Sequence, residues 1–256
     1  MDNQEPTPGR AKAPSASILG RKGMMAGLIL IVVIIAAFAV LVATVPPTAA
    51  PAPAVQPTTT TVQSSIPDVE LFVMSFCPFG TQAETAMEPV VNLLGPKADI
   101  TVRYITSIQG TTVSSLHGPA EAAEDLRQIC IHEYYPGQFW PYLTAFIQNC
   151  YPEVQNATLL AACQANTMQA LGIDSGKIGT CASGSDGLGL LTLDEQATAQ
   201  YGVQASPTLI IDGQVYNGDR TPEAYKEAIC SAFATPPAEC GTNLSTQTTT
   251  SSGGCG

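Results

Sequence analysis

Basic side chains are scarce in this chain of 256 residues, which has 10 lysines and arginines against 21 aspartates and glutamates and a formal net charge of −11. The first 22 residues hold four of the basic and two of the acidic side chains, so 6 basic and 19 acidic ones follow. Proteins that bind nucleic acid carry a basic patch that neutralises phosphates. We therefore expect no nucleic-acid partner.

Closely spaced cysteine pairs are also missing. Structural zinc sites usually take two ligands from such a pair, so we expect no metal site, although His117 and His132 are present. The chain has no phosphate-binding glycine loop and no serine-triad motif, and we expect no cofactor.

Eight cysteines are nevertheless present, which suits a protein outside the cytoplasm with several structural disulfides and one or two functional thiols. Spacing alone does not fix their pairing. The favoured structural pair is Cys230 with Cys240, because Thr235-Pro236-Pro237 can turn the chain back after a helix.

An uncharged, largely apolar run extends from Gly23 to Ala43. It is long enough to cross a bilayer core of about 30 Å, whereas a secretory signal has a shorter apolar segment. A single transmembrane helix over residues 23–45 is therefore favoured. A cleaved signal peptide is the alternative, since small residues such as Ala49 and Ala50 follow the run.

The charges on either side of this run predict its orientation. Residues 1–22 are basic, and positively charged flanks stay in the cytoplasm. The sequence thus predicts a single-pass protein of the cell membrane with its C-terminal part outside the cytoplasm. Residues 46–66, rich in Pro and Thr, are expected to form an extended linker, and the Ser/Thr/Gly tail 241–256 is expected to be disordered.

Between these segments, residues 67–240 have the pattern of an α/β domain. Apolar, β-branched runs predict strands at 69–74, 98–105, 208–212 and 215–216, and apolar residues at helical spacing predict helices at 81–94 and 223–233. The stretch between the second and third strands is helical, with breaks at 136–137, 151–152, 172 and 183–184. We expect a mixed sheet with a helical insert over about residues 112–202.

The segment Cys77-Pro78-Phe79-Gly80 lies directly between the first strand and the first helix. Unpaired N–H groups and the helix dipole at a helix N-terminus favour a thiolate, the form of cysteine that attacks disulfides. We therefore expect Cys77 to be a reactive, accessible thiol. The alternative is a small apolar residue packed at a strand end. Phe79 is either a surface aromatic beside the thiol or a core residue.

Ser206 and Pro207 introduce the third strand. A proline at this place is either a cis-proline in a turn or an ordinary proline of an edge strand. Together with the Cys77 segment, this pair resembles the thioredoxin superfamily. The order of the elements resembles that of DsbA-type oxidoreductases and gamma-interferon-inducible lysosomal thiol reductases, over roughly residues 68–235.

A third stretch is similar to the signature of the lysosomal thiol reductases. It keeps His117, Gly118, Glu121 and Cys130, but has Ser115 and Ala122 where the signature has cysteines. Gly80 also departs from the resemblance, because these families usually have their second redox cysteine at this position.

The resemblance implies a thioredoxin-like fold with Cys77 as the catalytic nucleophile. It further implies that Ser206 and Pro207 bind the substrate chain by β-augmentation, and that Pro78 and Phe79 lie beside it. The partners would be thiols and disulfides of proteins or peptides. The cis form of Pro207 is favoured on the same ground.

A lone thiol requires a second thiol to resolve its mixed disulfide. The candidates are a small thiol or redox partner protein, a cysteine of the insert, and Cys255 in the tail, although an intermolecular disulfide or an idle thiol is favoured for Cys255. Reduction or isomerisation fits a lone thiol better than net oxidation, which needs a stored disulfide. The predicted function is a membrane-anchored, extracytoplasmic thiol-disulfide oxidoreductase. The alternative, which Gly80 supports, is a non-catalytic peptide-binding or anchoring module.

Overall fold

The structure is a computed structural model that describes residues 63–247 and 253–256. The predicted cytoplasmic segment 1–22, the transmembrane helix 23–45 and most of the linker 46–66 lie outside the described residues. Within the two described stretches, no helix combines the length and the apolar composition that crossing a bilayer requires.

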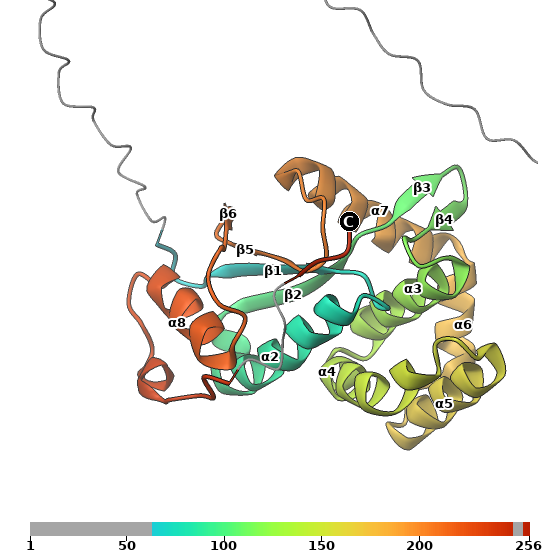
Figure 1. Cartoon of the computed structure of the whole chain (residues 1–256), viewed down its shortest axis with the longest axis horizontal. Coiled ribbons are helices and arrows are strands. Elements are labelled where there is room, and N and C mark those ends of the chain that lie inside the picture. Colours follow the sequence, from blue (N-terminus) through green and yellow to red (C-terminus); the bar gives the residue numbers. More distant parts are fainter. Residues whose placement is uncertain (1–62, 248–252) are drawn as a thin grey trace, which may run out of the picture. The chain divides into compact units, whose positions relative to one another are not determined.

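A mixed sheet of four strands forms the centre of the domain (Figure 1). Its order is β2 (Asp99–Tyr104), β1 (Asp68–Val73), β5 (Thr208–Ile211) and β6 (Gln214–Val215). β1 and β2 are parallel, as the sequence predicted, while β5 is antiparallel to both β1 and β6. Parallel neighbours need a long crossover, and the helix that follows Cys77 supplies it.

Helices cover both faces of this sheet (Figure 1). On one face, α2 (Pro78–Leu94) packs against α8 (Pro222–Ala232), and Val69, Leu71 and Val73 of β1 join the core there. Side chains alternate along a strand, so Phe72 points to the opposite face. There its ring meets Tyr201 of α7 (Ser185–Tyr201) at 6.1 Å between centroids, edge to face.

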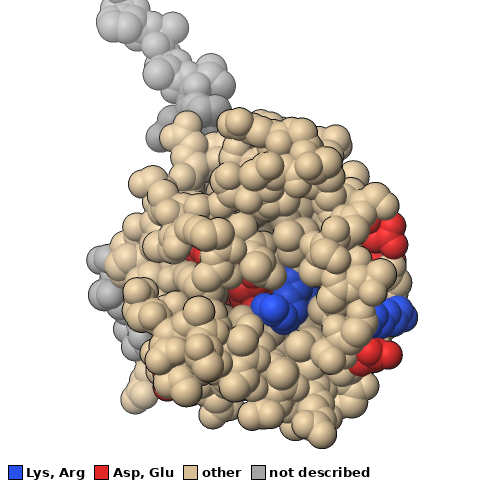
Figure 2. Space-filling model, turned by 90° about the vertical axis from the view of Figure 1, so that its right-hand side faces the viewer, with Lys and Arg blue, Asp and Glu red and all other residues tan. Residues whose placement is uncertain are grey.

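The helical insert lies at one end of the sheet and begins with α3 (Pro119–Tyr134) and α4 (Pro136–Ala145) (Figure 1). A π-helical turn, Phe146–Cys150, leads to α5 (Ala157–Ala170) and α6 (Ser175–Ser183). The disulfide Cys130–Cys181 joins α3 to α6, and Cys150–Cys163 joins the π-helical turn to α5. Figure 2, which views the domain from this side, shows few charged side chains.

The four predicted breaks all lie at or between helix ends. A proline in the first turn begins α4, and the side chains of Asn156 and Asp174 cap the N-termini of α5 and α6. The sequence did not predict the hairpin β3 (Ser107–Gln109) and β4 (Thr112–Ser114), whose residues are largely exposed, nor the 3-10 helices Gly95–Lys97, Tyr151–Glu153 and Ala238–Gly241. Gly110, at a φ of 65°, makes the turn of the hairpin.

Within the tail 241–256, for which the sequence predicts disorder, residues 242–245 make hydrogen bonds to α8. The disulfide Cys230–Cys240, the pair favoured from the sequence, joins α8 to the last 3-10 helix. Beyond it, the Leu244 N–H donates to Glu223 at 2.6 Å, and buried Lys226 donates to the Thr242 carbonyl at 2.7 Å. These hydrogen bonds satisfy polar backbone groups of the segment and hold it against α8.

Buried carboxyl groups connect the insert to the sheet. Asp194 of α7 accepts bonds from the Tyr104 backbone N–H at 2.9 Å and from Arg103 at 3.1 Å, and Arg103 also donates to Glu70. Burial raises the pKa of Asp194 to about 6 in spite of these donors.

The pKa of Glu84 in α2 is raised further. Burial and the nearby carboxyl groups of Asp125 and Glu124 raise it to about 8.

We predict that Glu84→Gln removes part of the pH dependence of stability. The folded protein keeps a proton on Glu84 that the unfolded chain loses above about pH 4.5, so this stabilisation is complete below that pH and is lost as the pH rises through about 8. One proton changes the free energy of unfolding by about 1.4 kcal/mol per pH unit. In urea titrations, the variant should therefore gain stability relative to the parent between about pH 5 and pH 8.

The matched control is Glu88→Gln, which removes a carboxylate from the same helix one turn further on, where Glu88 is half-buried and accepts a bond from Asn92. Parallel stability curves for the parent, Glu84→Gln and Glu88→Gln would contradict the role assigned to Glu84.

Candidate functional site

Cys77 occupies the N-cap position of α2, just after the carboxyl end of β1. Its backbone N–H donates to the Met74 carbonyl, and its own carbonyl accepts from the Thr81 N–H, both at 3.0 Å. The helix begins at Pro78, three residues before the predicted start, because a proline loses no hydrogen bond in the first turn. The sequence thus placed the cysteine correctly at a strand-to-helix junction.

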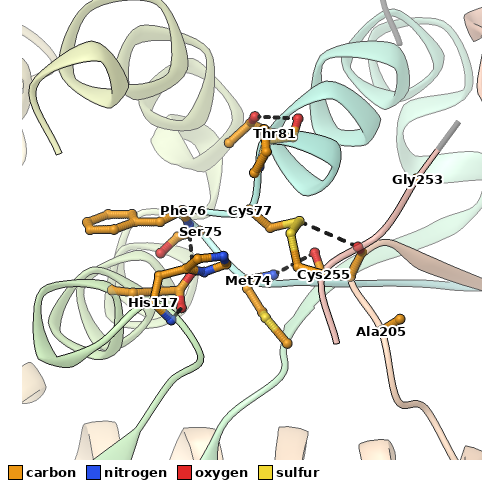
Figure 3. The surroundings of a disulfide bond; sticks show 12 residues. Met74, Ser75, Phe76, Cys77, Thr81, His117, Ala205, Gly253 and Cys255 are labelled. Atoms are coloured by element: carbon orange, nitrogen blue, oxygen red, sulfur yellow. Dashed lines mark hydrogen bonds and ion pairs between the residues drawn. A yellow bond between two sulfur atoms is a disulfide. The ribbon is translucent and has the colours of Figure 1, made fainter. Parts of the chain in front are cut away.

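Cys77 forms a disulfide with Cys255, 178 residues later in the chain, with 6.1 Å between the two Cα atoms (Figure 3). Cys77 is fully buried, whereas Cys255 is half-buried. The expectation of a free, accessible Cys77 thiol is therefore wrong in this state of the chain, and Cys255 is neither idle nor paired between molecules. The site also holds a disulfide, so the sequence-based argument against net oxidation no longer applies.

The backbone of Ser206 holds the Cys255 segment in place. The Ser206 N–H donates to the Cys255 carbonyl at 2.7 Å, and the Cys255 N–H donates to the Ser206 carbonyl at 2.8 Å, which makes an antiparallel β-bridge. The Sγ atom of Cys77 lies 3.5 Å from the same Ser206 carbonyl oxygen. The Ser206–Pro207 peptide bond is cis, the form that the family resemblance favoured.

Gly80 lies against Ser206 from the other side. A Cβ atom at position 80 would stand 2.6 Å from Ser206 Oγ and 3.1 Å from the Met74 carbonyl oxygen. Ser206 Oγ cannot move freely, because it accepts the Met74 N–H at 3.0 Å. The position where a second redox cysteine was expected therefore has no room for a side chain, and the partner of Cys77 comes from the tail instead.

Two acidic residues of α3 hold the loop that precedes Cys77. Glu121 accepts the Phe76 N–H at 2.8 Å, and Asp125 accepts the Ser75 N–H at 3.2 Å. Both carboxyl groups are fully buried, and burial raises the pKa of Asp125 well above its usual range. These contacts fix the backbone from which the Cys77 side chain projects.

The same carboxyl groups also bind the segment before α3. Glu121 accepts the His117 N–H at 2.8 Å and lies 2.8 Å from His117 Nδ1, while Ser115 Oγ donates to Asp125 at 3.0 Å. The stretch that resembled the thiol-reductase signature therefore supports the cysteine loop. Sequence reasoning missed this positioning role of Glu121 and Asp125, although the signature stretch was a signal for it.

Phe79 and Arg220 border the tail segment. Gly253 lies so close to the Phe79 ring that a Cβ atom there would meet three of its carbons within 3.0 Å, and Arg220 donates to the Gly253 carbonyl. Phe79 is half-buried and Pro78 is exposed, so both lie at the rim of the site. No motif in the sequence pointed to Arg220. Among residues 63–247 and 253–256, no three His, Cys, Asp or Glu side chains are arranged to hold a metal ion.

We predict that Gly80→Ala destabilises the domain by about 1–3 kcal/mol, because the methyl group meets Ser206 Oγ and the Met74 carbonyl. Adding Ser206→Ala should recover part of this loss, so the two changes should not be additive. Urea titrations of the parent, both single variants and the double variant measure the coupling. Gly179→Ala, at a helical glycine with open space around it, is the control, and additive single effects would contradict the contact.

Two solved structures have a similar fold. The MdbA protein, a thiol-disulfide oxidoreductase from Actinomyces oris, superposes with a TM-score of 0.50 at 15% identity, over 67% of this chain and 83% of that chain. A structure described as a protein disulfide isomerase from Nitrosomonas europaea gives 0.50 at 13% identity, over 65% and 97%. At these identities the likeness concerns the fold, which is thioredoxin-like with a helical insert.

Two proteins related in sequence are vacuolar-sorting receptors. Vacuolar-sorting receptor 4 of Arabidopsis thaliana is 32% identical over 161 residues, which is 56% of this chain and 25% of the receptor, and vacuolar-sorting receptor 3 is 30% identical over 141 residues, which is 50% and 22%. The chain thus spans about a quarter of the length of these relatives. A family model described as the vacuolar sorting receptor thioredoxin-like domain matches residues 103–230, half of the chain. The chain belongs to this family of thioredoxin-like domains.

Proposed function

We propose that this protein is a thiol-disulfide oxidoreductase that acts on disulfides of proteins or peptides, with Cys77 as nucleophile and Cys255 as its resolving partner. The observation that carries the proposal is the Cys77–Cys255 disulfide beside Ser206. It is a redox pair within one chain, and one of its members sits at a helix N-terminus, where first-turn N–H groups stabilise a thiolate.

The reaction balances with this pair alone. In the reduced enzyme, the Cys77 thiolate attacks one sulfur of a substrate disulfide, a mixed disulfide forms, and the other substrate sulfur leaves as a thiolate. The Cys255 thiolate then attacks the Cys77 sulfur, which releases the second substrate thiolate and restores the Cys77–Cys255 bond. The pair is oxidised by two electrons and the substrate is reduced by two. Two molecules of a small thiol, which leave as their disulfide, or one dithiol of a redox partner protein then reduce the pair again.

The same steps run backward when the oxidised pair meets a substrate with two thiols. The direction is then set by the reduction potential of the partner rather than by the missing second cysteine at position 80. In the reduced form, once Cys255 has left Ser206, Ser206 and Pro207 bind the substrate backbone, and Pro78 and Phe79 border it at the rim.

An alternative function is a non-catalytic peptide-binding or anchoring module. It is favoured by the full burial of Cys77 and by the family match, which covers residues 103–230 and therefore includes neither Cys77 nor Cys255. In that case, the Cys77–Cys255 disulfide is a permanent structural bond that holds the tail.

We predict that the full-length Cys255→Ser variant accumulates a mixed disulfide with a disulfide-bonded protein substrate, because nothing resolves it. The reduced parent should turn over without accumulating it, and Cys77→Ser should form none. Non-reducing electrophoresis followed by mass spectrometry identifies the bond. The matched control is the double variant Cys230→Ser with Cys240→Ser, which removes a structural disulfide and should behave like the parent. Absence of any adduct on Cys77 in the Cys255→Ser variant would favour the non-catalytic module.

We also propose that a transmembrane helix over residues 23–45 anchors the domain outside the cytoplasm. The basic flank before this run and the four disulfides of the domain support this placement, since disulfides persist outside the cytoplasm.

The topology predicts that a membrane-impermeant maleimide added to intact cells labels a cysteine introduced at exposed Thr111 but not one introduced at Ala11. Labelling at Ala11 alone would place the domain in the cytoplasm and overturn the proposal.

A further inference from the structure

The four residues Gly253–Gly256 occupy the site as an extended ligand would. Cys255 makes both backbone bonds of the bridge to Ser206, and Arg220 binds the carbonyl of Gly253 two residues earlier. The disulfide joins the Cys255 side chain to Cys77 between these two backbone contacts. The segment thus defines a groove with three bordering parts, which are Phe79 with Arg220, the backbone of Ser206, and the backbone of Gln204 and Ala205.

The groove leaves different amounts of space at the three glycines of this segment. At position 256, a Cβ atom would overlap with the Gln204 carbonyl oxygen and approach the Ala205 Cα atom to 2.9 Å. Both are backbone atoms, so this contact is not relieved by a side-chain rotation. At position 253, the added atom would meet the Phe79 ring, which is half-buried and can turn.

Position 254 differs from both. A Cβ atom there would lie 3.2 Å from the Ser206 carbonyl oxygen and 3.7 Å from the Ala205 Cβ atom, a tight but tolerable contact. Backbone pairing alone accepts any sequence, because every residue has the same N–H and C=O groups. The selectivity of the groove therefore comes from the places where a side chain does not fit.

We propose that this groove selects extended segments of the pattern Gly-x-Cys-Gly, and that the chain's own Gly253–Gly256 is an internal occupant which such a substrate displaces. The inference rests on the proposed function for its chemistry and on the shape of the groove for its selectivity. The residue after the reacting cysteine must be glycine, a glycine two residues before it is preferred, and the residue directly before it is free to vary.

Peptides with the sequence Ser-Ser-Gly-Gly-Cys-Gly, which copies residues 251–256, test the pattern when the cysteine is joined to thionitrobenzoate through a disulfide. The protein is the full-length Cys255→Ser variant, whose Cys77 is free to react. Its thiolate attacks the peptide sulfur, the Cys77–peptide bond forms, and thionitrobenzoate leaves as a coloured thiolate. The reaction of each peptide with glutathione corrects for intrinsic reactivity.

Alanine in place of the last glycine should slow the reaction with Cys77 by about tenfold or more, because overpacking against backbone is not relieved. Alanine at the place of Gly253 should have a smaller effect. Alanine at the place of Gly254, the matched control, should leave the rate within about twofold of the parent peptide. Equal rates for all four peptides would overturn the proposed selectivity while leaving the nucleophile in place.

A second measurement separates selectivity from chemistry. Fluorescently labelled peptides with serine in place of cysteine are titrated into the full-length Cys77→Ser, Cys255→Ser variant, and anisotropy gives their affinities. The order of affinities should follow the order of rates. If no peptide reacts with Cys77 but the affinities keep this order, the oxidoreductase fails and the groove stands. Equal affinities with equal rates would reject the groove pattern.

Discussion

Ser206 connects the parts of this site. Its side-chain oxygen accepts the Met74 N–H at the end of β1, its backbone pairs with Cys255, and its Oγ occupies the space that a side chain at position 80 would need. Because one residue makes all three contacts, the strand end, the first turn of α2 and the tail cannot shift independently. Ser206 thus both leaves no room for a side chain at position 80 and holds the tail cysteine beside Cys77.

The residues that hold the site in place lie in a different part of the chain from the two cysteines that would carry out its chemistry. Glu121 and Asp125 of α3 hold the backbone of Ser75 and Phe76, and both lie within the segment 103–230 that the family model matches. Cys77 and Cys255 lie outside it. A relative can thus keep the buried carboxyl groups and the loop they hold while having other residues at the two cysteine positions.

Most of the architecture was predictable because it follows from local patterns. The strands β1, β2 and β5 are apolar and β-branched, and the helix ends of the insert coincide with Pro136, Gly172 and Gly184. The resemblance predicted the superfamily, but it named other branches than the receptor family that the comparison found. The hairpin β3–β4 was missed because its short strands are mostly exposed and lack an apolar run.

The place of Cys255 was not predictable from local patterns. Its neighbours are glycines and serines without periodicity, and its binding partner is a backbone segment about 50 residues earlier, which offers no side-chain pattern to match. The steric role of Gly80 was hidden for a similar reason, because it depends on a contact with Ser206 across the fold.

The bond between Cys77 and Cys255 joins two positions 178 apart and turns most of the domain into a covalent ring, and the three other disulfides lie inside it. In the chain-entropy account, closing a ring of this size removes freedom from the unfolded chain worth about 5 kcal/mol. A single cut of the backbone inside the ring would leave the pieces linked. Reduction of this one bond thus changes the domain from a closed chain into an open one whose resistance to unfolding and proteolysis is lower.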